Sequence, residues 1–330
     1  MRVYVFKRLV IAGVTLLGMS ILIFVLMRLA PGNITDIVFE SAGYVDEADR
    51  KRLEAELGID KPVAVQYAHW LGEFVRGDLG KSYRYDLPAW EVIKPRLPVT
   101  LELAVLALGF SVILGVPAGV ISATRRGRPL DYALRVLSLA GLSMPSFWLG
   151  MIVILLLVRS LGVIPSMTYV SPFENLGANL FQFLLPGLAV GYRCSALIMR
   201  ITRSAMLEVL REDYIRTAWA KGQREAQVVW RHAFKNASLP VITLIGIEFA
   251  FLIGGLIVTE TVFNLPGVAR YLVDAIQVRD YPIVQNLVML IAVVVVLANL
   301  AVDLLYTWLD PRINRLLMLI DPAGFRWLTE

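Results

Sequence analysis

The chain has 330 residues, of which 57% are hydrophobic and 18% are charged, and its mean hydropathy is +0.66. A soluble domain carries about a quarter charged residues, so this composition excludes a soluble globular protein and indicates a membrane protein. The net charge of +5 does not indicate nucleic acid, because surplus basic residues in membrane proteins collect in cytoplasmic loops. One cysteine, Cys194, and two distant histidines, His69 and His232, argue against disulfide, redox and metal chemistry.

Six apolar segments are long enough to cross a bilayer, because about 30 Å of hydrocarbon requires about 20 helical residues. They lie at 9–30, 100–123, 134–158, 181–200, 239–261 and 284–309. The first segment follows Arg2, Lys7 and Arg8, as in a signal peptide, but it is too long and lacks an A-x-A cleavage site. We interpret it as a retained anchor helix.

The basic residues of the short loops gather on one side of these six spans, which also holds both termini. The long segment 31–99 carries both signs of charge and is uninformative, since long segments translocate largely regardless of charge. We therefore expect both termini to be cytoplasmic.

The predicted fold is an all-α membrane protein with six transmembrane helices. We expect an anchor helix at 1–30, a small extracytoplasmic helical subdomain at 31–99, a transmembrane domain at 100–315 and a cytoplasmic tail at 316–330. Hydrophobic residues in the second segment recur as on amphipathic helices: Leu53, Leu57, Tyr67, Trp70, Leu71 and Phe74. The loop 200–238 contains no proline and has charges at nearly every turn, so it should project into the cytoplasm as helices.

The sequence GDLGKS at 77–82 resembles the end of a phosphate-binding loop. That motif requires a glycine at position 75, which is Val75, so we prefer a tight turn in the outer subdomain. No protease or hydrolase motif of the types H-E-x-x-H or G-x-S-x-G is present. We therefore expect a chain without catalytic residues, metal ligands or a cofactor of its own.

Within the loop 200–238, Ala218 and Gly222 are four residues apart and would share one face of a helix. Such small side chains allow another protein to approach the backbone closely, which suits a docking surface. The alternative is a solvated charged loop with an ordinary glycine break.

The sequence resembles the inner-membrane permease subunits of peptide ABC importers, a group that includes dipeptide, oligopeptide and nickel permeases. The resemblance extends over nearly all of residues 1–315. It rests on LAPG at 29–32, LGIDKP at 57–62, GDLGKS at 77–82, SMPSFW at 143–148, DYIRTAWAKG at 213–222, ETVF at 260–263, RDYP at 279–282 and DPR at 310–312. It implies a multi-pass protein of the prokaryotic cytoplasmic membrane.

In that family an EAA-type coupling helix docks on a cytoplasmic ATPase. By resemblance, Ala218, Ala220, Lys221 and Gly222 should lie at that contact, with Asp213 and Tyr214 shaping its approach. The implied partners are two ATP-binding subunits, which hold ATP and Mg, a second homologous permease, an extracytoplasmic binding protein and membrane lipid, with no nucleic acid. Two positions depart from the family pattern: Trp219 replaces a frequent Arg, and Ala269, which we expect in an outer loop, replaces a frequent Gly.

Ionisable residues within the spans are costly and usually face a cavity or a partner. Arg193 and Glu248 lie at comparable depths in the fourth and fifth spans, so either they form a structural or gate ion pair, or each faces a separate polar environment. Asp303 and Asn299 pose the same choice and favour helix packing. The prolines Pro117, Pro145 and Pro186 within spans are either hinges or passive bends.

The function that this sequence favours is a permease subunit of an ATP-driven peptide importer. Two alternatives stay open: a permease for nickel chelates or other small solutes, and a self-sufficient secondary transporter that needs no ATPase. The sequence does not identify which solute is transported.

Overall fold

The computed structural model describes residues 2–29, 60–82, 84–85, 87–162 and 168–309. In chain order its helices are α1 (Arg2–Leu29), α4 (Val63–Val75), α5 (Ala89–Ile93), α6 (Leu97–Thr124), α7 (Pro129–Ser143), α8 (Ser146–Leu161), α9 (Leu176–Val209), α10 (Asp213–Ala220), the π-helix η1 (Gln227–Ala233), α11 (Phe234–Gly255), α12 (Ile257–Val262), α13 (Val268–Gln277) and α14 (Tyr281–Leu309). The only extended pairing in these ranges is a bridge between Lys81 and Pro88. The predicted all-helical fold class is thus confirmed.

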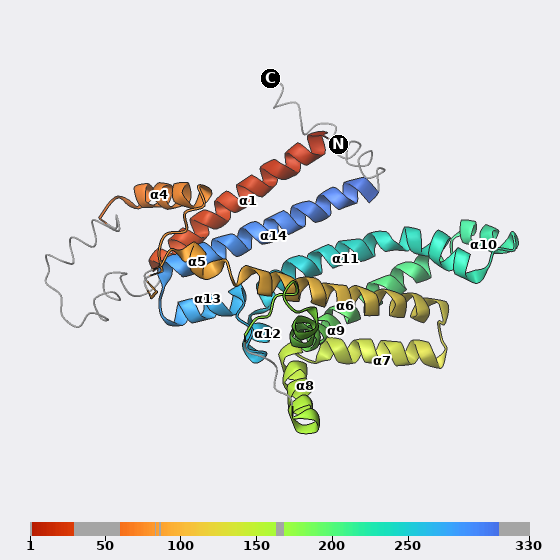
Figure 1. Cartoon of the computed structure of the whole chain (residues 1–330). Helices are drawn as coiled ribbons and strands as arrows, with labels where there is room; N and C mark the ends of the chain where they lie inside the picture. The colour runs from red at the N-terminus through yellow and green to blue at the C-terminus, as the bar shows by residue number, and fades with distance from the viewer. Residues whose placement is uncertain (1, 30–59, 83, 86, 163–167, 310–330) are drawn as a thin grey trace, which may run out of the picture.

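The long helices run alongside one another in an elongated bundle (Figure 1). Helix α10 lies at one end of this bundle, and α5 and α13 lie near the other. We call these the α10 end and the α13 end. Their separation matters for function, because they hold different groups of the polar residues described below.

Five helical segments are long and apolar enough to cross a membrane: Val5–Leu29, Ala89–Thr124, Leu176–Val209, Gln227–Gly255 and Tyr281–Leu304. A sixth candidate is the pair α7 and α8, which meet at an angle of 101°. The number of predicted spans is therefore reached only if this bent pair counts as one.

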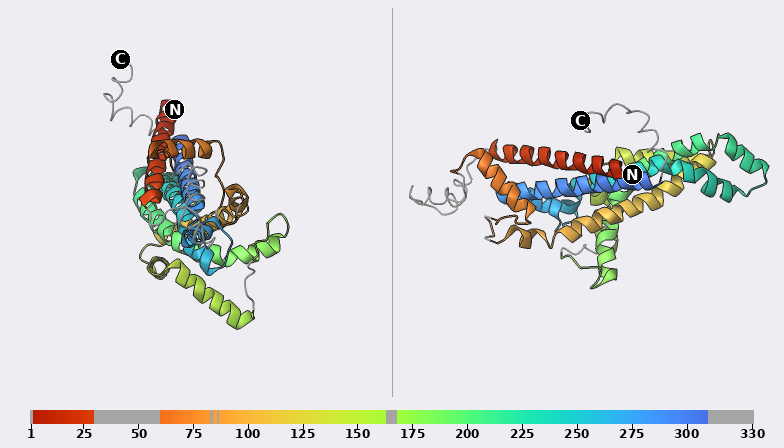
Figure 2. Two further views of the ribbon diagram at one scale, coloured as in Figure 1. Left: turned by 90° about the vertical axis from the view of Figure 1, so that its left-hand side faces the viewer. Right: turned by 90° about the horizontal axis from the view of Figure 1, so that it is seen from above.

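The predicted continuous span at 134–158 is wrong in its shape. The chain leaves α7 at Met144, which has an extended backbone (φ −96°, ψ 129°), and α8 begins after Pro145. Proline has no N–H to donate and forces the preceding residue away from helical angles. Figure 2 shows the result, with α8 projecting away from the long helices. Pro117 and Pro186, by contrast, lie inside the uninterrupted helices α6 and α9.

Two further span boundaries differ from the prediction. Helix α9 continues to Val209, so the beginning of the predicted loop 200–238 is part of a long helix. Helix α11 begins at Phe234 and ends at Gly255, so the fifth span ends before position 261. Glu260 consequently lies in the separate helix α12.

Helices α6 and α9 pack closely through glycines. A Cβ atom at Gly115 would lie 2.7 Å from the Ser195 carbonyl oxygen, and one at Gly119 would lie 2.5 Å from the Thr202 Cβ. From the other side, a Cβ at Gly191 would lie 2.7 Å from the Ala107 carbonyl oxygen. Small residues four apart allow such backbone approach between membrane helices, where packing replaces the hydrophobic effect as the main attraction.

The amphipathic helix α4 packs on the long helices α1 and α14. The Tyr67 hydroxyl lies 2.8 Å from Ser20 Oγ, and Trp70 Nε1 donates to Asn286 Oδ1 at 2.9 Å. The Phe24 ring contacts both aromatic side chains, with centroid distances of 5.4 and 5.9 Å. The predicted hydrophobic positions Leu53 and Leu57 lie outside the described residues.

Candidate functional site

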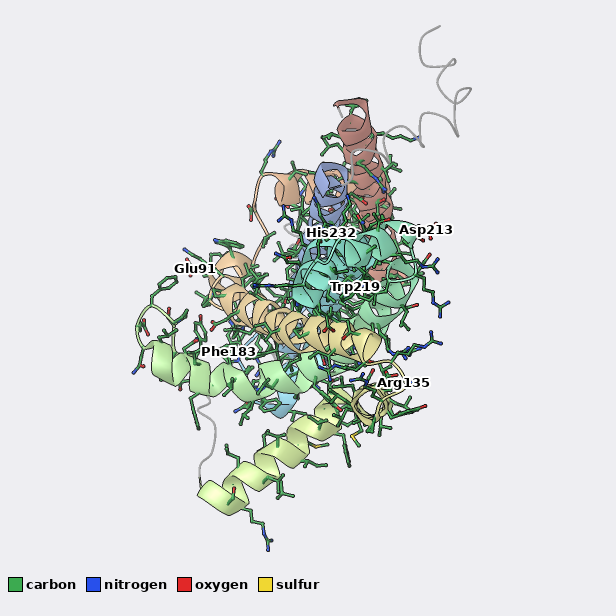
Figure 3. All side chains as sticks on the ribbon, turned by 90° about the vertical axis from the view of Figure 1, so that its right-hand side faces the viewer. Glu91, Arg135, Phe183, Asp213, Trp219 and His232 are labelled. Carbon is green, nitrogen blue, oxygen red and sulfur yellow. The ribbon has the colours of Figure 1, made fainter. Side chains whose placement is uncertain are left out.

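The α10 end is built from α10, η1 and the adjoining ends of α9 and α11 (Figure 3). Helix α10 begins after Glu212, whose backbone is extended (φ −69°, ψ 147°), and the first-turn carboxylate of Asp213 is favourable at a helix N-terminus. Asp213 also accepts a hydrogen bond from Arg216 at 3.2 Å, and both side chains are exposed. Short local signals therefore explain why a helix forms here.

One face of α10 is buried against the long helices. Ile215 is 1% exposed and Ala218 is 7% exposed, and residues three apart lie on the same helical face. They belong to a hydrophobic cluster that includes Met206 of α9, Val228 of η1 and Ala237 of α11. This cluster holds α10 against the bundle.

The opposite face of α10 is open to solvent. Trp219 is 46% exposed, and Ala220 and Lys221 are exposed beside it. The expectation that Ala218 and Gly222 present one common docking face is wrong, because Ala218 points into the hydrophobic cluster and Gly222 follows the end of α10. The exposed surface consists of larger and charged side chains instead.

Gly222 ends the helix. Its φ is +72°, a left-handed conformation that glycine adopts without strain. The Gly222 N–H donates to the Trp219 carbonyl at 2.9 Å, and the Gln223 N–H donates to the Ala218 carbonyl at 3.4 Å. This pair of bonds is the Schellman arrangement, which satisfies carbonyls that have no partner within the helix.

Tyr214 connects α10 directly to the following span. Its hydroxyl accepts a hydrogen bond from Asn236 Nδ2 of α11 at 2.7 Å. With the hydrophobic cluster, this bond attaches α10 to both α9 and α11. A displacement of α10 would therefore act on two spans.

A buried ion pair near the α10 end was missed by the sequence analysis. Asp131, which is 1% exposed, accepts two hydrogen bonds from the Arg203 guanidinium, at 2.9 and 3.0 Å. It also accepts from Ser122 Oγ at 2.5 Å and from the Gly127 N–H at 3.0 Å. These bonds join α6, α7 and α9. A sequence signal was present, since Asp131 is the one acidic residue in the basic stretch 125–135.

The two intramembrane residues Arg193 and Glu248 both lie near Cys194. Arg193 is exposed and Glu248 is 7% exposed, and no ion pair joins them in the part of the chain that the structure describes. Asp303, in contrast, pairs with Arg8 at 3.0 Å and so connects α14 to α1. The helix-packing alternative for Asp303 agrees with this contact.

At the α13 end, the segment 77–82 forms a tight turn. Gly77 and Gly80 have φ values of +84° and +67°. Ser82 Oγ donates to Asp280 Oδ2 at 2.5 Å, and Asn286 Nδ2 donates to the Leu79 carbonyl at 2.8 Å. The turn is thus attached to the beginning of α14, which agrees with the preference for a structural turn over a nucleotide site.

Glu260 is fully buried at the α13 end and holds α12, α13 and α6 together. Its carboxylate accepts from Thr100 Oγ1 at 2.6 Å and from the Arg270 N–H at 2.8 Å. A Cβ at Gly267 would lie 2.2 Å from this carboxylate, so glycine is required there. The expectation of a loop at Ala269 is wrong, because Ala269 lies in the first turn of α13 and is 2% exposed.

The loop before α9 also lies toward the α13 end. The Tyr169 hydroxyl donates to Glu102 Oε2 near the start of α6 at 3.0 Å. Burial, together with this carboxylate, raises the pKa of Tyr169 to about 12, so the phenol stays protonated as a donor. Within the described ranges, no three His, Cys, Asp or Glu side chains are grouped so as to hold a metal ion.

Residues 115–315 match the family described as the binding-protein-dependent transport system inner membrane component, and residues 1–104 match its N-terminal family. The chain belongs to this family. It is a multi-pass protein of the cytoplasmic membrane and a permease component of an ABC transport system. The resemblance of the sequence to such permeases is confirmed.

Relatives of the chain match over nearly its whole length. It is 39% identical to the dipeptide transport system permease protein DppB of Alkalihalophilus pseudofirmus, covering 95% of this chain and 100% of the relative. It is 40% identical to the protein of the same name from Escherichia coli, covering 94% and 98%. A solved structure of the MetNI methionine ABC transporter, in an inward-facing conformation, aligns with a TM-score of 0.52 at 18% identity, covering 66% of this chain and 96% of that chain. That likeness shows a shared fold.

Proposed function

We propose that this chain is a permease subunit of an ATP-driven peptide importer. It forms the translocation pathway with a second homologous permease and takes its cargo from an extracytoplasmic binding protein. Two cytoplasmic subunits bind ATP and Mg and drive the cycle. The choice of peptide as cargo is supported by the two relatives named for dipeptide transport.

The observation that carries the coupling role is the two-sided construction of α10. Its inner face, with Ile215 and Ala218, is buried against α9, η1 and α11, while Trp219, Ala220 and Lys221 are exposed at the end of the bundle. We assign the exposed side to the contact with an ATPase. Gly222 contributes by ending α10, and Trp219 supplies an aromatic surface at a position where the family often has Arg.

The contacts of α10 offer a route for coupling. Tyr214 bonds to Asn236 of α11, and the ion pair between Asp131 and Arg203 joins α9 to α6 and α7. ATP-driven movement of the docked subunit would shift α10 and bias the spans between inward and outward access, as a ligand biases a two-state element. The distribution of basic residues in the loops supports an orientation with the α10 end in the cytoplasm.

Reversal of one exposed charge tests the docking role. In the complex purified from its native membrane, Lys221→Glu should abolish substrate-stimulated ATP hydrolysis, because it places a carboxylate at the contact without disturbing the buried face of α10. Arg159→Glu is the matched control, since it makes the same charge reversal at an exposed site in the last turn of α8. Normal stimulation in the Lys221→Glu complex would contradict the docking role.

Uptake of a radiolabelled dipeptide tests the cargo. Cells that lack the chain should lose this uptake and regain it on expression of the wild-type chain, but not of Lys221→Glu. Restoration of nickel-chelate uptake without any dipeptide uptake would contradict peptide cargo and leave the docking result unaffected.

A further inference from the structure

A groove with a volume of about 550 Å³ lies between α7 and α9. It is distinct from the exposed side of α10 and from the turn at the α13 end. Its lining combines cationic, hydroxyl and apolar groups, among them Tyr132, Arg135, Val136, Leu139, Arg200 and Ser204. Figure 3 labels Arg135 on α7, at the side of the bundle as seen from the α10 end.

The groove carries two uncompensated positive charges. Arg135 and Arg200 are exposed, and neither forms an ion pair with an acidic residue in the described ranges. The Arg135 guanidinium lies 5.7 Å from the centroid of the Tyr132 ring. A third arginine of the lining, Arg203, is neutralised by Asp131. The surface therefore complements an anion with a charge of one or two.

The same groove borders an apolar surface. On α7 the side chains of Val136, Leu137 and Leu139 are 66%, 56% and 63% exposed. Such side chains are costly in water but suit contact with acyl chains. A ligand that satisfies both parts of this surface has an anionic head and an apolar tail.

The depth of the groove fits the boundary of a membrane. Arg135 lies six residues after Pro129, the first residue of α7, which corresponds to about 9 Å along the helix axis. The polar headgroup layer on each side of a bilayer is about 5–8 Å thick. If α7 runs along the bilayer normal from the cytoplasmic surface, as the basic loops predict, Arg135 lies near the level at which headgroups meet acyl chains.

We propose that this groove binds an anionic phospholipid, whose phosphate pairs with Arg135 and Arg200 and whose acyl chains lie along the apolar side of α7. Guanidinium groups bind phosphate by paired N–H donors, and the arginine side chains are free to do so. A zwitterionic lipid brings its own cation close to the two arginines and is disfavoured. Because the lipid contacts both helices, its binding holds α7 against α9 next to the ion pair of Asp131 and Arg203.

The test is lipid binding to the purified full-length chain in detergent, followed by native mass spectrometry. Phosphatidylglycerol is titrated against phosphatidylcholine with the same acyl chains. The variant Arg135→Gln/Arg200→Gln should bind the first phosphatidylglycerol roughly thirtyfold more weakly than the wild type, since it removes two basic residues that each contribute about one kcal/mol to anionic-lipid attraction.

The matched control is Arg125→Gln/Arg126→Gln, which removes two charges from the exposed turn between α6 and α7, outside the groove lining. This control should retain wild-type affinity if the effect belongs to the groove. Equal loss in both variants, equal binding of phosphatidylcholine, or unchanged binding in Arg135→Gln/Arg200→Gln would each overturn the proposal.

Two further experiments distinguish a bound lipid from free phosphate and from a second permease subunit as the ligand of the groove. Inorganic phosphate should not displace the bound phosphatidylglycerol, because it leaves the apolar side of the groove empty; displacement at millimolar phosphate would overturn the lipid assignment. In native membranes, the variant Val136→Cys should not cross-link to a second permease. A cross-link there would make the groove a subunit interface. Circular dichroism checks that each variant folds, and the single variant Arg200→Gln replaces the double variant if the latter does not.

Discussion

The Asp131 carboxylate joins three helices through four hydrogen bonds. A carboxylate with so little exposure is stable only when its charge is paired and its oxygen atoms are bonded. Here the partner guanidinium comes from a residue 72 positions away in the sequence. Asp131 therefore fixes the turn between α6 and α7 against α9 at the α10 end.

Asp131→Asn should lower the free energy of unfolding by about 3 kcal/mol, because it leaves the partly buried Arg203 guanidinium without its counter-charge. Thermal unfolding of the purified chain in detergent measures this effect. The matched control is Asp213→Asn, which breaks an ion pair between two exposed side chains and removes one first-turn charge, so it should lower the unfolding temperature far less. Equal unfolding temperatures for Asp131→Asn and wild type would contradict the role of the buried pair.

For single residues, the sequence predicted where a candidate site lies better than it predicted which way the side chains point. It marked the region 213–222 but assigned Ala218 to the exposed side, because spacing shows which residues share a helical face and not which way that face points. It also treated Gly222 as part of the helix, although its φ of +72° ends α10. Both errors concern tertiary packing, which the local pattern does not contain.

Among the elements, α6 and α9 depend most on small residues. Gly119→Ala should destabilise the chain by about 2 kcal/mol, because its Cβ would overlap Thr202 and overpacking in a close interface costs energy of this order. Gly109→Ala is the matched control on the same helix, since nothing lies within 4 Å of a Cβ there. The measurement is again thermal unfolding in detergent. A smaller effect for Gly119→Ala than for Gly109→Ala would contradict the packing account.

The glycine at the end of α10 allows a second prediction about a single helix. Gly222→Ala should loosen the last turn of α10, because an L-residue in the left-handed conformation costs about 1 kcal/mol. Faster hydrogen–deuterium exchange in the peptide covering 213–223 measures this loosening. Gly72→Ala, in the interior of α4 with no positive φ, should not increase exchange in its own helix. Unchanged exchange at α10 would argue against the Schellman cap.

The long helices were located where composition decides, and their breaks and ends were missed where the backbone decides. The apolar runs located every long helix, since a bilayer requires about 20 consecutive apolar residues. The break at Met144 was missed because Pro145 interrupts a run whose composition stays apolar. Pro117 and Pro186 lie in equally apolar runs, but the helices that contain them are continuous. The presence of a proline alone therefore does not predict whether a span is broken.

For the whole molecule, the basic loops predict that the α10 end faces the cytoplasm. Cysteine labelling in intact cells tests this orientation, because the native Cys194 is fully buried and should react little. A membrane-impermeant maleimide should label Phe173→Cys, in the exposed loop before α9, and should not label Arg216→Cys on α10 until the membrane is opened. The reverse labelling pattern would contradict the orientation.

The global arrangement depends on contacts between distant segments, which a single sequence does not reveal. Ser82 and Asp280 bond across 198 positions, and Thr100 and Glu260 bond across 160. The motifs that contain Ser82, Glu260 and Asp280 were visible in the sequence as GDLGKS, ETVF and RDYP, but the contacts of these residues, including the one with Thr100, were not. The family and the region of the candidate site were therefore predictable, while the network that supports them required the structure.

The most direct test of the central claim, that this chain works as a permease driven by ATPases docked at α10, is purification of the tagged chain from its native membrane in mild detergent. Mass spectrometry then identifies the proteins that co-elute. The account predicts ATP-binding subunits and a second homologous permease with the wild-type chain, and loss of the ATP-binding subunits alone with Lys221→Glu. A chain that elutes only with itself, while the cells still take up dipeptide through it, would contradict the account.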